Sequence, residues 1–267
     1  MKSKLTVLGS GVCYSSFYKP FDFRNPSGHL LQVNGKNILV DVGDGIRRKM
    51  EEMRFDYYNL DTIFISHFHP DHFSIDSFIQ AFFVRAKKTK RLKNLSIYGP
   101  KKIKEIFIAI WNKKNIPSYE KSFPGLLEIK FYEYQDRKRM QIDNLAIIPF
   151  KVIHGGMDAY ALRFIIGDKV LAYSGDAAKC REIVEAAKGA DIFLCEAGNN
   201  IGDEKNKDLI HLTPYQAGEI GYKAAVKKLV LVHYSGKDTK EEMRKEVKRA
   251  GFGGIAEVAE DLDTFSI

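Results

Sequence analysis

Short runs of apolar, mostly β-branched residues recur along the chain, and many of them are bounded by Gly, Asn or Asp. Such runs are typical of β-strands. We predict strands over eleven segments: Leu5–Leu8, Leu30–Val33, Ile38–Val40, Ile63–Ser66, Ser96–Tyr98, Ile129–Tyr132, Ala146–Ile153, Leu162–Ile166, Val170–Ser174, Ile192–Cys195 and Leu229–His233. Two of the breaks, Asn34-Gly35 and Gly167-Asp168, favour tight two-residue hairpin turns.

Apolar residues at helical spacing lie between the later strands. Over Ser74–Lys88 and Lys101–Lys113 they form stripes along one side, which predicts two amphipathic helices. A third helix is predicted to begin at Pro214, because Thr213 and Gln216 have the spacing of a capping box. Hairpins followed by strands alternating with helices indicate an α/β protein, a mixed-sheet sandwich with helices outside. No repeat or linker divides the chain, so we expect one domain over residues 1–267.

The composition is that of an ordinary globular protein. The 267 residues are 45% hydrophobic and 28% charged. No apolar run approaches the ~18 residues of a membrane-spanning helix, and no N-terminal run reaches the ~7–15 residues of a secretory signal. Three cysteines are too few for a disulfide framework. We therefore expect a cytoplasmic protein with no membrane partner.

The net charge of +8 is concentrated in one segment. Residues 87–114 hold ten Lys or Arg and a single acid, Glu105. Such a patch would attract an anionic substrate, nucleic acid included. It is at least as typical of a solvated surface, so both interpretations stay open.

Three of the seven histidines fall within six residues, in the pattern H-x-H-x-D-H directly after a predicted strand. His67 and His69 are two apart, so in an extended chain both rings point to one side and can share a metal ion. Pro70 forces a turn that presents Asp71 and His72 for a second ion. These ligand types suit zinc, with manganese or iron as alternatives where a carboxylate is included.

The segment resembles the metal-binding motif of the metallo-β-lactamase fold superfamily, and other segments resemble that family's remaining motifs in the same order. Asp41-Val42-Gly43-Asp44-Gly45 resembles the family's D-x-G-x-G segment. Three further positions resemble metal ligands of the family. They are His154, which two glycines follow, Asp176, which follows a predicted strand, and His233, which ends another predicted strand. The resemblance runs from Lys4 to about Ser235.

The resemblance implies a four-layer αββα sandwich with a metal site along one edge. It implies seven ligands for two divalent ions: His67, His69 and His154 for one, Asp71, His72 and His233 for the other, and Asp176 between them. Two ions ~3.5–4 Å apart can hold a hydroxide nucleophile and clamp the attacking and leaving oxygens. Because Asp71 would hold an ion at that position, we also count it as catalytic.

At some positions this sequence differs from the motifs of particular branches of the superfamily, which reduces the number of activities that we expect. Asp176 stands where class B β-lactamases commonly have cysteine, and His69 stands where flavodiiron oxidoreductases usually have glutamate, which disfavours both activities. Glu196 and His211 lie in segments similar to those of the ribonuclease Z branch, although Cys195 replaces a usual histidine there. In that branch the histidine matching His211 supports the scissile phosphate and the leaving group. We therefore predict His211 as general acid, with Glu196 orienting its ring.

The stretch between His154 and Asp176 is filled by a predicted hairpin and has no room for the tRNA-gripping arm typical of that branch. We predict a dinuclear metal-dependent hydrolase, a phosphodiesterase or ribonuclease Z-like enzyme, acting on RNA or a small phosphodiester. The alternative is an ester, lactone or thioester hydrolase of the same fold. A second alternative is a nucleic-acid-binding module without activity. Relatives are often dimers, so a homodimer is one expected state. We expect His29 to be structural and the loop with Cys13 and Tyr14 to border the site.

Overall fold

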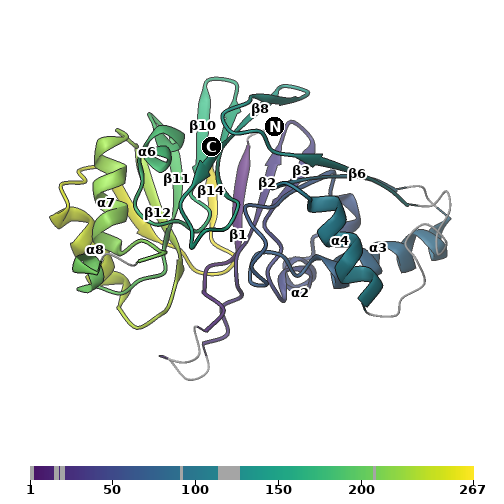
Figure 1. Cartoon of the computed structure of the whole chain (residues 1–267), viewed down its shortest axis with the longest axis horizontal. Helices are drawn as coiled ribbons and strands as arrows, with labels where there is room; N and C mark the ends of the chain where they lie inside the picture. Colours follow the sequence, from purple (N-terminus) through teal and green to yellow (C-terminus); the bar gives the residue numbers. More distant parts are fainter. Residues whose placement is uncertain (1–2, 15–17, 19–21, 91–92, 114–126, 207–208) are drawn as a thin grey trace.

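The strands form two seven-stranded sheets that face each other (Figure 1). The structure is a computed structural model that describes residues 3–267 except 15–17, 19–21, 91–92, 114–126 and 207–208. The strands of the first sheet, in spatial order, are β14 (Thr264–Ser266), β1 (Lys4–Gly9), β2 (Gly28–Val33), β3 (Lys36–Val40), β4 (Thr62–Phe64), β5 (Lys93–Gly99) and β6 (Leu127–Glu133). Those of the second sheet are β13 (Ile255–Val258), β12 (Lys228–Tyr234), β11 (Ile192–Ala197), β10 (Lys169–Tyr173), β9 (Ala159–Ile166), β8 (Leu145–Val152) and β7 (Met140–Ile142).

All eleven strands predicted from the sequence are present, and so are both hairpins. Val33 lies opposite Lys36, and the turn residues Asn34 and Gly35 both have positive φ, at 51° and 78°. Ile166 pairs with Lys169 in the same way, across a turn in which Gly167 has a φ of 61°. Turns of these types match the twist of the strands that they join. Strands β7, β13 and β14 were not predicted.

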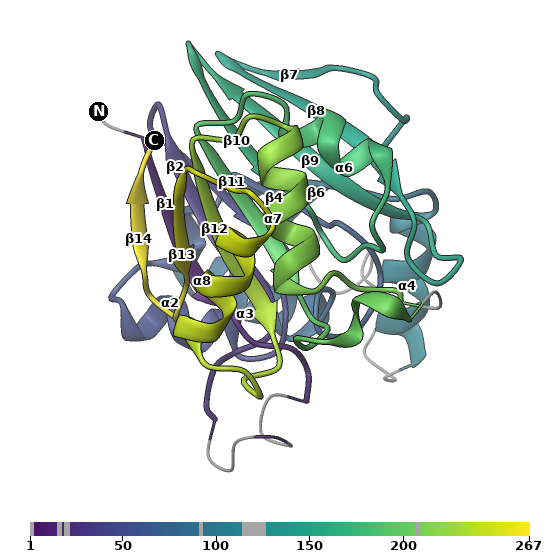
Figure 2. The same cartoon turned by 90° about the vertical axis from the view of Figure 1, so that its left-hand side faces the viewer.

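Helices cover the outer face of each sheet, three to a side among the described residues (Figure 1). Those on the first sheet are α2 (Ile46–Glu52), α3 (Ile75–Thr89) and α4 (Ile103–Lys113). Those on the second sheet are α6 (Arg181–Ala187), α7 (Pro214–Lys223) and α8 (Lys240–Arg249), which Figure 2 shows side by side across it. Two 3₁₀ turns, Tyr57–Asn59 and Asp203–Lys205, lie in the connections. Helices α3, α4 and α7 confirm the three predicted helices.

Three apolar clusters fill the spaces between these layers. Phe64 and Phe164 come from different sheets and meet edge to face between them, with ring centroids 5.6 Å apart. Trp111 is buried under the helices of the first sheet. Phe193 is buried under those of the second. The order is therefore helix, sheet, sheet, helix, which confirms the αββα sandwich.

The basic segment lies on the outer layer of the first sheet. Lys87 and Lys88 are exposed at the end of α3, and Lys101, Lys102 and Lys104 are exposed around the start of α4. Arg91 and Lys114 lie outside the described residues. Helices in the described ranges are all too short or too polar to cross a membrane.

Candidate metal centre

Seven side chains from both sheets converge at one edge of the sandwich, as two groups that share Asp176. In each group the ligand atoms all lie within 4.8 Å of one another. The first group is His67, His69, His154 and Asp176, and the second is Asp71, His72, Asp176 and His233. These are the seven residues that the sequence motifs suggested, and the shared carboxylate is the one that the resemblance places between two ions.

The first group forms where the chain leaves β4, β8 and β10. His69 Nδ1 lies 3.1 Å from His67 Nε2 and 3.1 Å from His154 Nε2. Asp176 Oδ2 lies 3.8 Å from His67 Nε2 and 4.0 Å from His154 Nε2. Three imidazoles and one carboxylate in such an arrangement are a ligand set that zinc accepts.

The second group places two imidazoles against two carboxylates. Asp176 Oδ2 is 3.2 Å from His72 Nε2 and 3.4 Å from His233 Nε2, which is also 3.4 Å from Asp71 Oδ2. His233 ends the regular part of β12 with a φ of 50°. Such a backbone conformation in a residue other than glycine costs about 1–3 kcal/mol and is often found at functional sites.

The Nδ1 atoms of three of these histidines have hydrogen-bond partners outside the two groups, so their Nε2 atoms face the other ligands. His72 Nδ1 donates to the Asp41 carboxylate at 2.8 Å, and His154 Nδ1 donates to the Ile210 carbonyl at 2.9 Å. His67 Nδ1 lies 3.0 Å from the Ser66 hydroxyl, which itself donates to Asp41 at 2.7 Å. Hydrogen bonds of this kind set the tautomer and orientation of metal-binding histidines.

Buried polar atoms without partners show that the donor set fits metal ions. His72 Nε2 and Asp176 Oδ1 are both buried and make no hydrogen bond within the described part of the chain. Asp176 Oδ2 lies 3.2 Å from His72 Nε2, where it forms an ion pair only when the ring is protonated. Unpaired buried polar atoms are costly, and a cation between the two groups would give both atoms a partner.

The local electrostatics favour the neutral form of two histidines of the first group. Burial, reinforced by the neighbouring His72, holds the pKa of His67 well below its ordinary value. Burial and His154 lower the pKa of His69 in the same sense. Metal ions bind the neutral form of imidazole, so the cluster keeps these two rings in the state that a metal needs.

Glu196 and His211 lie beside the two groups and form, with His233, a third set of residues that could hold an ion. His211 Nδ1 lies 3.2 Å from Glu196 Oε1, and that carboxylate is held by the backbone N–H groups of Ala177, at 2.9 Å, and Gly198, at 2.8 Å. Burial opposes protonation of His211, but the charges of Glu196 and Asp176 outweigh it and raise the pKa of His211 to about 9. The His211 side chain is 17% exposed, so the ring reaches the open side of the site.

Asp41 is the functional residue that sequence reasoning left without a role. Besides His72 and Ser66, its buried carboxylate accepts a hydrogen bond from the Tyr173 hydroxyl at 2.7 Å. The D-x-G-x-G pattern pointed to this segment, but it did not predict the three hydrogen-bond partners of the Asp41 carboxylate. His29 lies outside the metal groups found among the described residues.

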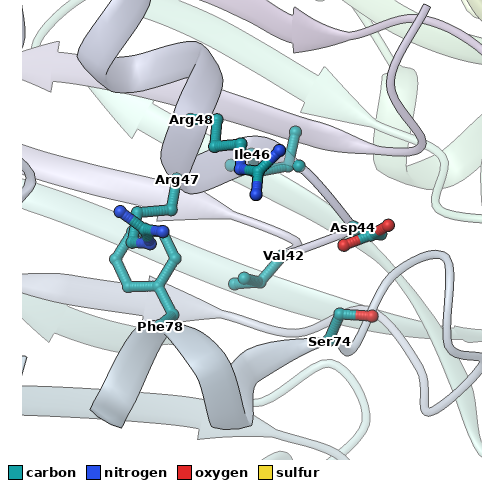
Figure 3. A pocket seen from close by; sticks show the side chains of 9 residues that line it. Val42, Asp44, Ile46, Arg47, Arg48, Ser74 and Phe78 are labelled. Atoms are coloured by element: carbon teal, nitrogen blue, oxygen red, sulfur yellow. The ribbon is translucent and has the colours of Figure 1, made fainter. Parts of the chain in front are cut away.

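A separate cavity of about 310 Å³ is lined by residues 42–45 and by residues at the starts of α2 and α3 (Figure 3). Val42, Asp44, Arg48, Ser74 and Phe78 line part of it. None of the seven clustered residues does, so the metal chemistry is not located there.

The family model described as Anti-Pycsar protein Apyc1 matches residues 3–258. The chain belongs to the Apyc1 family. A curated relative of this Apyc1-family chain, ribonuclease Z of Pyrococcus horikoshii, is 28% identical over 270 residues, covering 84% of the chain and 86% of the relative.

Solved structures show the fold of the Apyc1-family chain. The metallo-β-lactamase fold protein YhfI from Bacillus subtilis superposes with a TM-score of 0.83 at 23% identity, and both chains are covered in full. A diphosphatase of the PhnP family superposes with a TM-score of 0.75 at 21% identity, covering 100% of this chain and 98% of that one. The metallo-β-lactamase fold predicted from the motifs is confirmed. Together with the curated relative and the His/Asp cluster, it supports a metal-dependent hydrolase, also as predicted.

Proposed function

We propose that this chain is a metal-dependent phosphodiesterase that acts on small phosphodiesters. The observation that carries the proposal is the Glu196–His211 pair, which stands beside the two ligand groups with its imidazole toward the open side. A phosphodiester has a poor leaving group, and a positioned acid at that oxygen is what its cleavage needs. A lactone or carboxylic ester does not need this pair.

The proposal assigns metal binding to seven residues and proton transfer to two others. His67, His69 and His154 would hold one divalent ion, Asp71, His72 and His233 the other, and Asp176 both. Two bound ions activate a water and neutralise phosphoryl oxygens. His211 donates a proton to the departing oxygen, and Glu196 stabilises the protonated ring and fixes its orientation. Zinc suits this mixed nitrogen and oxygen set, with manganese or iron as the other candidates.

The preference for small substrates rests on the chain between His154 and Asp176. That stretch is occupied by β9 and β10, which a two-residue turn joins into a hairpin. No arm for gripping a large RNA emerges from it. RNA is the second candidate substrate, because the curated relative is named a ribonuclease and the basic segment offers a surface for a polyanion.

Replacing His211 with alanine tests the proposal directly. The variant should keep its metal content and lose kcat by roughly 10²–10⁴ on a dinucleoside monophosphate, the usual contribution of a positioned acid. The loss should be smaller on bis(p-nitrophenyl) phosphate, because nitrophenolate leaves without a proton. Steady-state kinetics and metal analysis by mass spectrometry measure both effects.

A His69→Ala variant serves as the control, because it should lose metal and activity on both substrates alike. If His211→Ala loses its metals, the third potential metal group, Glu196 with His211 and His233, is a ligand set and the role of acid is wrong. If it keeps full activity on the dinucleoside, the ester and lactone alternatives move ahead. Cytoplasmic location and a homodimer stay predictions, which fractionation and light scattering would test.

A further inference from the structure

The backbone around His211 is held by hydrogen bonds at three consecutive carbonyl groups. These are the carbonyls of Ile210, His211 and Leu212. The Ile210 carbonyl accepts from His154 Nδ1 at 2.9 Å. Both others accept from Asn199, whose side-chain Nδ2 donates to His211 at 2.6 Å and whose backbone N–H donates to Leu212 at 3.0 Å. Asn199 therefore holds the chain directly after the His211 side chain.

An asparagine side chain suits the place that it occupies beside His211. A carbonyl oxygen only accepts hydrogen bonds, so the atom 2.6 Å from it must be the amide nitrogen of Asn199. An aspartate has the same shape but no donor, and it would turn a negative oxygen toward the His211 carbonyl. Asparagine and aspartate are therefore not equivalent at position 199.

The turn that carries Asn199 also contacts the His211 ring. A Cβ atom at Gly198 would lie 3.0 Å from His211 Cγ and 3.1 Å from its Nδ1, so the main chain at this glycine packs directly against the imidazole. The Gly198 N–H donates to the Glu196 carboxylate at 2.8 Å, and that carboxylate lies 3.2 Å from His211 Nδ1. Because Nδ1 faces Glu196, Nε2 is the ring nitrogen that remains for a substrate oxygen.

The His211 ring lies next to one residue of each metal group. Its centroid is 5.1 Å from that of His154 and 5.3 Å from that of His233. A general acid works only within hydrogen-bond reach, about 2.6–3.2 Å, of the oxygen that it protonates. A displacement of about 1 Å can lower a rate roughly 10²-fold. The hydrogen bond from Asn199 secures the chain that carries this ring, so its loss would affect the rate.

We propose that Asn199 is a positioning residue: its side-chain amide holds the backbone of His211 so that Nε2 of the ring reaches the leaving oxygen of the substrate. The inference rests on the proposed function, since it concerns the same proton transfer. Asn199 lies outside the metal groups of the described residues and acts only through His211.

Steady-state kinetics of Asn199→Ala and Asn199→Asp on a dinucleoside monophosphate and on bis(p-nitrophenyl) phosphate test the proposal. Both variants should keep the metal content of the wild type. On the dinucleoside monophosphate kcat should fall about 10- to 100-fold, as it does for a misplaced catalytic group, while KM changes little. On bis(p-nitrophenyl) phosphate the fall should be smaller, because nitrophenolate leaves without a proton. In a His211→Ala background, Asn199→Ala should lower kcat no further, because the two residues act as one unit.

Asn37→Ala is the matched control for the loss of a hydrogen bond. The Asn37 side chain also donates from Nδ2 to a backbone carbonyl, that of Asn59, at 3.0 Å, but it lies near the start of β3. This variant loses a bond of the same kind and should keep the wild-type kcat on both substrates.

Equal losses of kcat on the two substrates, or a further loss in the His211→Ala background, would overturn the role of Asn199. So would a loss of bound metal or an unchanged kcat in either Asn199 variant. All of these results are compatible with phosphodiester hydrolysis by the wild type. If the wild type turns over neither substrate, the proposed function itself is wrong, and the role of Asn199 is overturned with it.

Discussion

At the residue scale, the seven clustered side chains depend on neighbouring residues for their orientation. Asp41 is fully buried and takes a φ of 59°, which aims its carboxylate at Ser66, His72 and Tyr173 together. The spacing of the histidines is enough to predict candidate metal ligands, because residues close together after one strand are also close in space. The role of Asp41 could not be predicted that way, because its partners lie at the ends of two other strands, β4 and β10.

His29 allows a prediction about pH at the same scale. Burial lowers the pKa of His29 to about 4, and the ring packs edge to face on Tyr173 with centroids 5.1 Å apart. In the unfolded chain the pKa returns to about 6.5, so below that pH the unfolded state binds a proton that the folded state refuses. His29 should therefore reduce the free energy of unfolding by about 2 kcal/mol between pH 7.5 and pH 5.

Urea denaturation of the metal-free wild type and of His29→Leu at the two pH values measures this effect. Metal-free protein is used so that loss of ions in acid does not contribute. The wild type should lose more stability than the variant by that amount. The same loss in both proteins would mean that His29 is not the group responsible.

At the scale of elements, the short and highly charged segments escaped prediction from the sequence. In α8 only Met243 and Val247 are buried, so the apolar pattern is too sparse to indicate a helix. The capping box between Thr239 and Glu242 was the available indication. Strands β13 and β14 are short edge strands of four and three residues. Their pairing depends on distant partners rather than on a local pattern.

Gly175 shows how an element end positions a ligand. It has a φ of 58°, and a Cβ atom there would lie 2.8 Å from the Tyr160 carbonyl oxygen and 3.2 Å from the Ser66 Cβ. Gly175→Ala should therefore displace the neighbouring Asp176 and weaken metal binding by about 10- to 100-fold, as changes around a ligand do. Competition with a chelator of known affinity measures this.

Gly167→Ala is the matched control for the backbone. Gly167 has a similar φ of 61°, but a Cβ atom there would meet nothing within 4 Å. This variant should lose about 1–2 kcal/mol of stability from the strained backbone and keep its metal affinity. Equal metal affinity in the two variants would show that the contacts around Gly175 do not hold Asp176 in place.

At the scale of the whole molecule, the candidate site forms only when the two sheets are packed together. The first sheet supplies His67, His69, Asp71 and His72 after β4, and the second supplies His154, Asp176 and His233. The order of motifs along the sequence was enough to predict the fold and to bring these residues together. The hydrogen bond from the Tyr14 hydroxyl to the Gly198 carbonyl was not predictable, because it joins segments that are distant in the sequence.

The central claim is that this metal cluster performs phosphodiester hydrolysis. The most direct measurement is the rate of bis(p-nitrophenyl) phosphate hydrolysis by chelator-treated protein as Zn²⁺ or Mn²⁺ is added back. We predict no turnover without metal and a rate that rises and levels off at two equivalents per chain, because the ligands form two groups joined by Asp176. Full turnover by the metal-free protein, or none after reconstitution with either metal, would contradict the account.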